Sequence, residues 1–526
     1  MFANFGKYFA FICRRERLSS PIWLLSIVCF AVLCASAYPG LLPDKASLIG
    51  AMTMMNTPAM IAMMGNVYGL GAPTQAIAMA QECLVWFLLA IAIMNVFLVN
   101  RHTRVDEELG RQEMLIALPV GRMTGSVSAL AFASALNVLI AAFISVGLIA
   151  FDIDGTTVSG AFAYGGVIGA TGFLFAALTL LAAQVLSTSR GVAGIGMAAL
   201  GLSYILRASG DVSDNALSLI SPIGLGLKIE AFYSDDPLPI AIILAEGIVL
   251  AVGALALNAV RDHGTGIIAA RRGKSRASRF LRSPFGLARR LVRNTAVCWT
   301  VALFVIGCMY GSVASDIEDF AADNEMVSQF LEAAGGGTMT EQYIAMLFSV
   351  MGILCAVPCA SSVLRLRSEE SRGRLEQVFA RSVKRSSMFF GFVVISFAEG
   401  FVMLFATAAG MVSASGGLIE FGVTLQSAFA YLPALWAMTG CAALLVGALP
   451  KLTALVWAMI GYSFVAIYLG LLLDFPAWTM QITPFGHIPQ LPVDEFSFAP
   501  LVAISAIAAT LTAVGAWRYG KRDIAQ

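Results

Sequence analysis

The sequence has little charge for its length. Only 12% of its 526 residues are charged and 59% are hydrophobic, whereas soluble domains have about 25% charged and about 45–50% apolar residues. This deficit excludes a soluble enzyme and a disordered protein. The formal net charge of +1 provides no long-range attraction to phosphate, which also excludes a nucleic-acid-binding protein.

Residues that form metal sites, disulfide frameworks and nucleotide sites are few or wrongly spaced. The three histidines, His102, His263 and His487, lie far apart, and none belongs to an HExxH pattern. The nine cysteines fall in predicted helices or in the N-terminal segment, so no disulfide framework is expected on the outer face. The sequence GKS at 273–275 ends like a phosphate-binding loop, but that loop needs a glycine where Ile268 stands. We therefore expect no catalytic residue, no metal site and no cofactor bound by this chain.

Long apolar runs, in contrast, recur along the whole sequence. Each is long enough to cross about 30 Å of hydrocarbon as a helix, and backbone groups in lipid must bond within the segment, which excludes open strands. We predict an all-α polytopic membrane protein with twelve transmembrane helices. They cover Pro21–Tyr38, Met79–Asn100, Thr124–Ala150, Ala161–Val185, Gly191–Leu206, Ile240–Val260, Ala296–Ser315, Ile344–Leu364, Met388–Val412, Ser427–Leu449, Leu452–Leu473 and Pro500–Trp517.

The basic residues orient these helices. With a cytoplasmic N-terminus, the predicted outer segments hold only Lys45, Arg207 and Lys228 of the 33 Lys and Arg residues, as the positive-inside rule requires. The acidic residues show the opposite distribution, with clusters in the predicted outer segments at Asp235–Asp236 and from Asp316 to Glu341. We therefore expect both termini in the cytoplasm.

The chain contains an internal duplication. The segment DEELGRQEMLIALPVGR at 106–122 aligns without a gap with EESRGRLEQVFARSVKR at 369–385, an offset of 263 (369 − 106). The sequence SPIG at 221–224 matches TPFG at 483–486 at an offset of 262 (483 − 221). The pattern predicts two parallel six-helix repeats.

The duplication defines the predicted domains. They are a first six-helix transmembrane half at 1–260, a basic cytoplasmic linker and interfacial helix at 261–293, and a second six-helix transmembrane half at 294–526. The N-terminal sequence also has the pattern of a signal peptide. Its cleavage would leave eleven spans and break the duplication, so the uncleaved form is favoured.

A charged motif opens each copy of the repeated segment, and we term residues 106–113 and 369–376 the charged boxes. Glu107 and Arg111 stand four apart, as do Glu370 and Arg374, a spacing that stabilises a helix by a few tenths of a kcal/mol. Two copies at one offset favour a docking surface for a partner protein over a solvated turn. The candidate coupling residues are Glu107, Gly110, Arg111, Glu113, Glu370, Gly373, Arg374 and Glu376.

Two outer segments, Asp211 to Pro239 and Asp474 to Phe498, are too broken to span and too apolar for solvated loops, so we expect re-entrant helices. Small residues in spans five and eleven allow close helix approach, and polar side chains beside them would line a substrate path between the halves. Ordinary helix packing is the alternative. The candidate cavity residues are Ser203, Tyr204, Trp457, Tyr462, Ser463 and Glu399.

Glu399 is the sharpest of these candidates because it lies near the middle of span nine. Intramembrane carboxylates are costly and often functional. Glu399 could bind a cationic substrate, relay a proton, or be a protonated acid bonded to a neighbouring helix, and the sequence leaves these alternatives open.

With its repeated charged boxes, its SPIG and PFGHIPQLP (484–492) sequences and the basic ending at 518–523, the chain resembles the membrane subunit of bacterial ATP-binding-cassette (ABC) exporters of type 2, in the double-length form of polyketide and antibiotic exporters. The resemblance covers nearly the whole chain. It implies a permease in the bacterial plasma membrane that exports a hydrophobic or amphipathic compound. It also implies that two copies of a separate cytoplasmic ATPase, which bind ATP and Mg²⁺, dock on the charged boxes.

Two other classes compete with this hypothesis. A secondary transporter of the major-facilitator kind also has twelve helices in two parallel halves, but its loop motif GxxxDRxGRR shares only an acid and Gly-Arg with residues 106–111. A membrane transferase would need a His-Asp pair or a metal cluster, and the sequence supports neither. The exporter is therefore favoured, with membrane lipid and a small hydrophobic substrate as further partners and no nucleic acid.

Overall fold

The computed structural model describes residues 3–116, 119–262, 264–268, 276–322, 339–381, 383–469 and 476–523. Within these ranges the regular structure is helical, apart from one isolated bridge between Leu186 and Ile268. Eleven of the described helices are long and apolar enough to cross a membrane. The chain is therefore a polytopic helical membrane protein. A shorter apolar helix, Leu455–Tyr468, lies where the eleventh span was predicted, and the end of that span falls outside the described residues.

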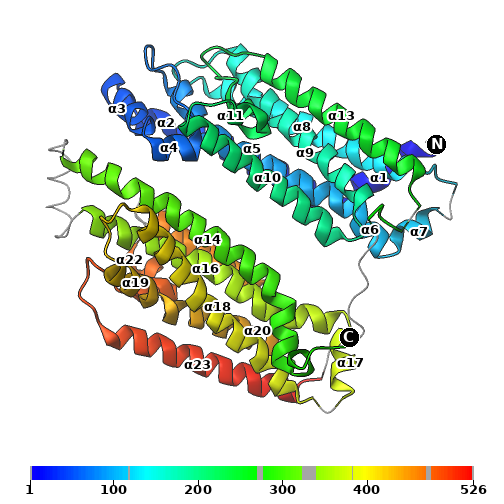
Figure 1. Ribbon diagram of the computed structural model, residues 1–526, viewed down its shortest axis with the longest axis vertical. Helices are drawn as coiled ribbons and strands as arrows, with labels where there is room; N and C mark the ends of the chain where they lie inside the picture. Colours follow the sequence, from blue (N-terminus) through cyan, green and yellow to red (C-terminus); the bar gives the residue numbers. More distant parts are fainter. Residues whose placement is uncertain are drawn as a thin grey trace. The chain divides into compact units, whose positions relative to one another are not determined.

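The chain divides into two compact units, Met1–Gly273 and Lys274–Gln526, each a bundle of long helices (Figure 1). The first unit contains α1 (Phe5–Arg15), α2 (Ser19–Leu41), α3 (Lys45–Met55), α4 (Pro58–Met64), α5 (Gln75–His102), α6 (Arg104–Glu108), α7 (Arg111–Ile116), α8 (Thr124–Phe151), α9 (Val158–Val185), α10 (Ser189–Val212), α11 (Leu217–Ile220), α12 (Pro222–Leu227) and α13 (Leu238–Val260). The second contains η1 (Phe280–Arg282), α14 (Pro284–Ala322), α16 (Met339–Ser371), α17 (Arg374–Phe379), α18 (Arg385–Ala414), α19 (Phe421–Ala430), α20 (Leu432–Ala448), α21 (Leu455–Phe464), η2 (Val465–Leu469), α22 (Ala477–Ile482), η3 (Pro484–His487) and α23 (Phe498–Lys521).

Helices α5 and α9 form the centre of the first unit, because they bury residues along nearly their whole length. Helix α9 packs on α5, α8 and α13. Its glycines allow this close approach: a Cβ atom at Gly165 would lie 2.4 Å from the carbonyl oxygen of Ala141 on α8. Without a hydrophobic force between helices in lipid, such small-residue contacts hold the bundle together.

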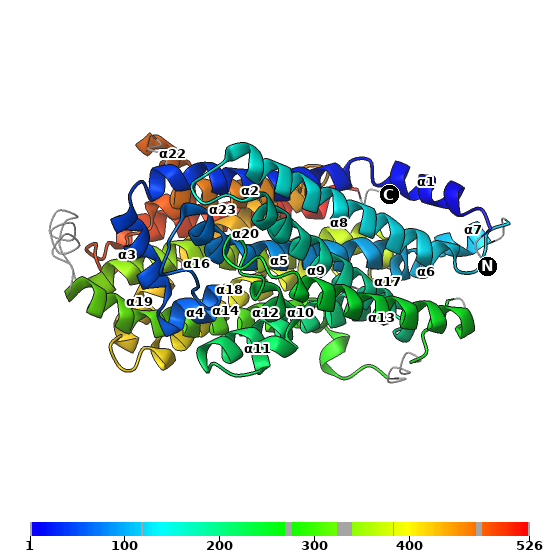
Figure 2. The same cartoon turned by 90° about the horizontal axis from the view of Figure 1, so that it is seen from above.

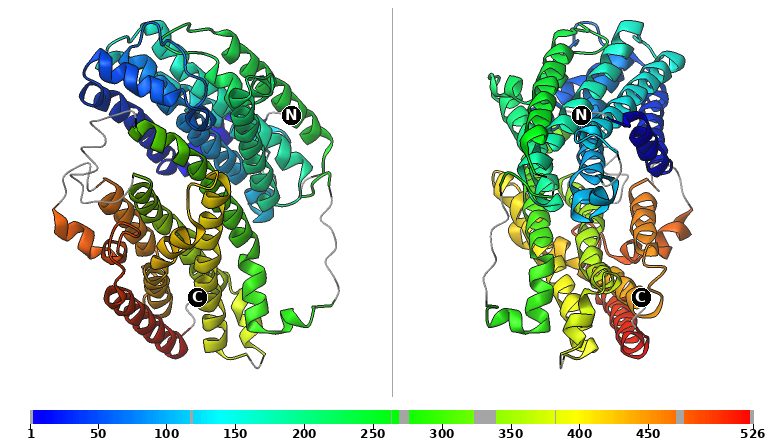
Figure 3. Two further views of the ribbon diagram at one scale, coloured as in Figure 1. Left: turned by 60° about the vertical axis from the view of Figure 1, so that its left-hand side comes forward. Right: turned by 90° about the vertical axis from the view of Figure 1, so that its right-hand side faces the viewer.

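The second unit is built around α16, α18 and α20. Helix α14 packs along α18, and α23, red in Figure 3, packs along α20. The sequence predicted a separate interfacial helix before the seventh span. Instead α14 runs without a break from Pro284, a residue suited to the first helical position, through the whole span. The centre of the predicted linker, residues 269–275, and most of the acidic cluster from 316 to 341 lie outside the described residues.

Short helices occupy the two predicted outer segments. In the first unit α11 and α12 lie beside α10 (Figure 2), and in the second α22 and η3 precede α23. None of the four exceeds six residues. Both segments are thus folded, with helices far too short to cross a bilayer.

Candidate functional site

Each charged box folds into a sharp turn between two helical pieces. The box glycines, Gly110 and Gly373, have φ angles of 69° and 68°, a left-handed conformation that glycine adopts without steric cost. The turn breaks the helix after α6 in the first box and after α16 in the second. The predicted pairs of Glu107 with Arg111 and of Glu370 with Arg374 are therefore wrong, since the residues do not share one helix.

The box arginines pair with the preceding acid instead. Arg111 Nη1 lies 3.2 Å from Asp106 Oδ1, and Arg374 Nη1 lies 3.3 Å from Glu369 Oε2. Asp106 and Glu369 occupy the same place in the two copies (369 − 106 = 263). The two aligned segments therefore match in this side-chain contact as well as in sequence.

The next acid of each box binds an arginine at the end of its own unit's bundle. Arg261, the C-cap of α13, donates through Nη1 to Glu107 Oε2 over 3.1 Å, and Glu107 also pairs with Arg104. Arg522, the C-cap of α23, donates to Glu370 Oε2 over 2.6 Å. These ion pairs attach each charged box to the last helix of its unit.

A second contact repeats the attachment. Arg122 donates a hydrogen bond to the Arg261 carbonyl oxygen, and Arg385, its counterpart in the second copy, donates to the Arg522 carbonyl oxygen over 2.8 Å. Arg261 and Arg522 were not among the functional residues predicted from the sequence. Their signal was an arginine within five residues of the end of the last apolar run of each half.

The first box has an additional tie to the N-terminal helix. Arg15 of α1 donates through Nη2 to Asp106 over 2.9 Å, and Glu16 lies 2.8 Å from His102 Nε2 and 3.1 Å from Arg101. Burial alone would raise the pKa of the Glu16 carboxyl, but His102 and Arg101 outweigh it and hold that pKa below its ordinary value.

Several other box residues are exposed. In the first copy Arg111 and Glu113 are exposed, and Met114 beside them is 68% exposed. In the second, Arg374 and Glu376 are exposed in the same positions. Each box therefore has an inner acid that holds it to the bundle and an outer charged surface open to a partner.

The predicted cavity serines form hydrogen bonds to the outer segments. Ser221 donates to the Ser203 carbonyl oxygen over 2.6 Å, and the two hydroxyls lie 2.8 Å apart. In the second unit the Thr483 hydroxyl donates to Ser463 Oγ over 2.8 Å. Ser203 and Ser463 are buried and join a span to an outer segment through these contacts, and Ser203 also lines an apolar pocket of the first unit.

The two predicted cavity tyrosines bond to backbone near the same places. Tyr204 donates to the Met63 carbonyl oxygen over 3.2 Å, and Tyr462 to the Thr479 carbonyl oxygen over 2.9 Å. Arg207, expected on the outer side, is fully buried and donates to the Ile61 and Met63 carbonyl oxygens over 3.1 Å each. It thereby holds the end of α4 against α10.

Polar groups also meet within the bundles. Asn95 of α5 and Asn137 of α8 form a reciprocal amide pair, with N···O distances of 2.8 and 3.1 Å. In the second unit Glu399 is buried on α18 and accepts a hydrogen bond from Ser362 on α16. Trp457 is exposed on α21.

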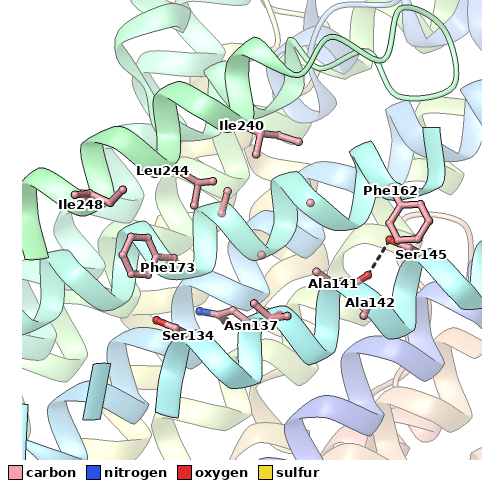
Figure 4. Close-up of a pocket in the computed structure, with 14 residues that line it drawn as sticks. Ser134, Asn137, Ala141, Ala142, Ser145, Phe162, Phe173, Ile240, Leu244 and Ile248 are labelled. Atoms are coloured by element: carbon pink, nitrogen blue, oxygen red, sulfur yellow. Dashed lines mark hydrogen bonds between the residues drawn. The ribbon is translucent and has the colours of Figure 1, made fainter. Parts of the chain in front are cut away.

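Two apolar pockets open on the first unit. One of about 600 Å³ lies among α8, α9 and α13, with Asn137, Phe162 and Ile240 in its lining (Figure 4). The other, of about 650 Å³, is lined by residues of α9, α10 and α13 and includes Glu246. Both have the volume of small-molecule sites, about 300–1,000 Å³, with few polar groups.

Known proteins identify the class of this chain. A model of the family described as "Multidrug efflux system permease Rv1217c, C-terminal domain" matches residues 281–520. The chain is 33% identical over 524 residues to the multidrug efflux system permease protein Rv1217c of Mycobacterium tuberculosis, covering 97% of this chain and 93% of that protein. The chain belongs to the family of multidrug efflux permeases. The permease is accordingly a transport protein rather than an enzyme, and its two bundles with their charged boxes are parts of an efflux system.

Proposed function

We propose that the permease is the membrane subunit of an ATP-driven ABC exporter of type 2, in the double-length form. Its two units would be parallel six-helix repeats in the bacterial plasma membrane, with both termini cytoplasmic. The cargo would be a hydrophobic or amphipathic compound such as an antibiotic, a drug or a lipid-like molecule. The name of the mycobacterial relative, a multidrug efflux permease, supports this class of cargo.

The observation that carries the proposal is the repeated attachment of the charged boxes. Glu107 to Arg261 and Glu370 to Arg522 are the same connection, made once in each unit. A box that only fixed topology would not need a buried ion pair to the last helix of its bundle. A box that receives mechanical displacement from a partner does, because a loose loop would absorb the movement.

The proposal divides the predicted coupling residues into two groups. Arg111, Glu113, Arg374 and Glu376 would contact the ATPase, since they are exposed. Glu107 and Glu370, with the glycines between the groups, would hold the boxes in place. Two copies of a cytoplasmic ABC ATPase would dock, one on each box, and the ATP and Mg²⁺ would be bound by those copies.

Affinity purification in mild detergent from the native host tests this proposal. We expect an ABC ATPase to co-purify, and Glu113→Lys combined with Glu376→Lys to abolish its recovery. The matched control reverses two other exposed charges of the predicted cytoplasmic loops, Arg190→Glu with Lys451→Glu, and should retain the ATPase. Equal loss of the ATPase in both double variants, or a permease purified without any ATPase, would contradict the proposal.

A further inference from the structure

A carboxyl group lies buried in the middle of α18 with one oxygen unused. Only 7% of Glu399 is exposed, and Ser362 donates to its Oε2 over 2.6 Å. Its Oε1 has no hydrogen-bond partner among the described residues. A buried acceptor without a partner costs free energy, and acids inside membrane spans are usually functional. Glu399 thus lacks a donor or a cation that the described part of the chain does not supply.

Glu399 lines a groove of about 380 Å³ between α14 and α18. The two helices touch on either side of the groove. At one end Gly391 lies against Phe285, and at the other the Thr407 carbonyl oxygen would be 2.3 Å from a Cβ atom at Gly307. The walls between these contacts are mainly aliphatic and include Val292, Val297, Val301, Val394 and Val402. The groove therefore combines an apolar body with a single acid.

The duplicated fold does not require this acid. At the offset of 263, position 399 corresponds to 136, where the first unit has a leucine. Leu136 packs in the apolar core of its unit. The same helix of the repeat is thus held in the first unit without any carboxylate at this place, which argues against a purely structural role for Glu399.

Two arginines determine which way a ligand would lie. Arg289 and Arg293, one helical turn apart on α14, line the same groove and are exposed. None of the ion pairs among the described residues joins either of them to Glu399. A positive group is repelled at the arginines and attracted at Glu399, so a bound cation would place its charge at the acid.

We propose that this groove binds amphipathic organic cations, with Glu399 as the counter-ion and the valine walls as the site of the apolar or aromatic body. The proposal deepens the efflux function proposed above, on which its role in transport rests. Binding itself needs no ATPase, so it can be measured on the permease alone.

The test uses equilibrium binding of tritiated tetraphenylphosphonium to the purified full-length permease in detergent. Its four phenyl rings surround a fixed positive charge, and triphenylphosphine oxide serves as the neutral probe. We expect Glu399→Gln, which keeps the shape and removes the charge, to weaken binding of the cation about tenfold or more and to leave the neutral probe unaffected. Glu246→Gln removes the charge of an exposed span acid outside the groove and should change neither.

A second pair of variants tests the groove without touching Glu399. Val301→Trp places an indole in the groove and should abolish cation binding, whereas Val305→Trp, exposed one turn along the same helix and outside the lining, should not. Unchanged cation binding in Glu399→Gln, or equal effects of the two tryptophans, would overturn the cation site. Neither result bears on ATPase recovery, so the two proposals fail independently.

Discussion

Glu107 and Arg261 form an ion pair although they lie 154 positions apart in the sequence, with Arg261 Nη1 3.1 Å from Glu107 Oε2. Arg261 ends the last helix of its bundle, and Glu107 begins the turn that exposes Arg111 and Glu113. A displacement applied to that turn would therefore reach α13 through a direct charge-assisted contact rather than through a flexible loop. Glu370 and Arg522 repeat the relationship in the second unit.

Removal of the Glu107 carboxylate should be strongly destabilising. The side chains of Arg104 and Arg261 are only 1% and 3% exposed, so Glu107→Ala leaves two buried cations unpaired, at a cost of about 3–5 kcal/mol. The partners of Glu370, Arg367 and Arg522, are 21% and 16% exposed, so Glu370→Ala should cost less.

Thermal unfolding in detergent compares these variants, with Glu113→Ala as the exposed control. The expected order of Tm loss is Glu107→Ala, then Glu370→Ala, with Glu113→Ala near zero. A Tm for Glu107→Ala equal to that of the exposed control would show that the ion pair does not hold the box.

Alanine at either box glycine should strain the turn. A left-handed conformation costs an L-residue about 1–2 kcal/mol, and the space around Gly110 and Gly373 is open, so this conformational cost is the whole effect. Gly110→Asn should cost less than Gly110→Ala, because asparagine tolerates the left-handed region. Gly194→Ala on α10, also in open space but without a positive φ, is the control and should be neutral or stabilising. Equilibrium unfolding measures the loss of stability in each variant. An equal loss for alanine at Gly110 and at Gly194 would contradict the prediction.

The amide pair of Asn95 and Asn137 should show a measurable coupling. Each single change to alanine leaves the partner amide without its bond, whereas the double variant removes both groups. Interhelical hydrogen bonds in membranes average about 0.6 kcal/mol, with maxima of about 1.7, and the two bonds here place the expected coupling in that range. A double-mutant cycle measured by unfolding gives the value directly. Strict additivity of the two single changes would mean that the pair contributes nothing.

Acid should weaken the tie between α1 and α5. Because the folded pKa of Glu16 lies below its ordinary value of 4.5, the folded state binds fewer protons there, and stability rises with pH. The stabilisation is present above about pH 4.5 and disappears as the pH falls through the folded pKa. We expect wild type to exceed Glu16→Gln in Tm at pH 7 and the difference to shrink below pH 4.5. A difference that grows on acidification would have the wrong sign.

Features that depend on a local sequence pattern could be predicted. Features that depend on the rotation of a helix about its axis, or on contacts between residues far apart in sequence, could not. Apolar runs located the eleven spans found among the described residues, and the offset of 263 located both boxes. The matching SPIG and TPFG sequences of the two outer segments have an offset of 262. Rotation about a helix axis is not readable where a span is apolar on all sides. Ser203 was expected to line a cavity and Arg207 to lie on the outer side, but the hydrogen bonds that both make to neighbouring segments were not predicted. Arg261 and Arg522 lie more than 150 positions from their partners, beyond any local spacing.

The continuous helix expected at each box failed for a local reason. Gly110 and Gly373 are unfavourable in a helix interior and favourable in a left-handed turn. The turn places Arg111 next to Asp106 instead of Glu107. A glycine directly before the arginine in both copies was the available signal.

The energy source is the most direct test of the account. The permease would be reconstituted with its co-purifying ATPase in vesicles whose ATPase side faces out, with ionophores to collapse every ion gradient. Uptake of fluorescent hydrophobic and amphipathic compounds would then be followed. The account predicts accumulation that requires hydrolysable ATP and is lost in the Glu113→Lys, Glu376→Lys variant. Accumulation by the permease alone, driven by a proton or sodium gradient and indifferent to ATP, would contradict it.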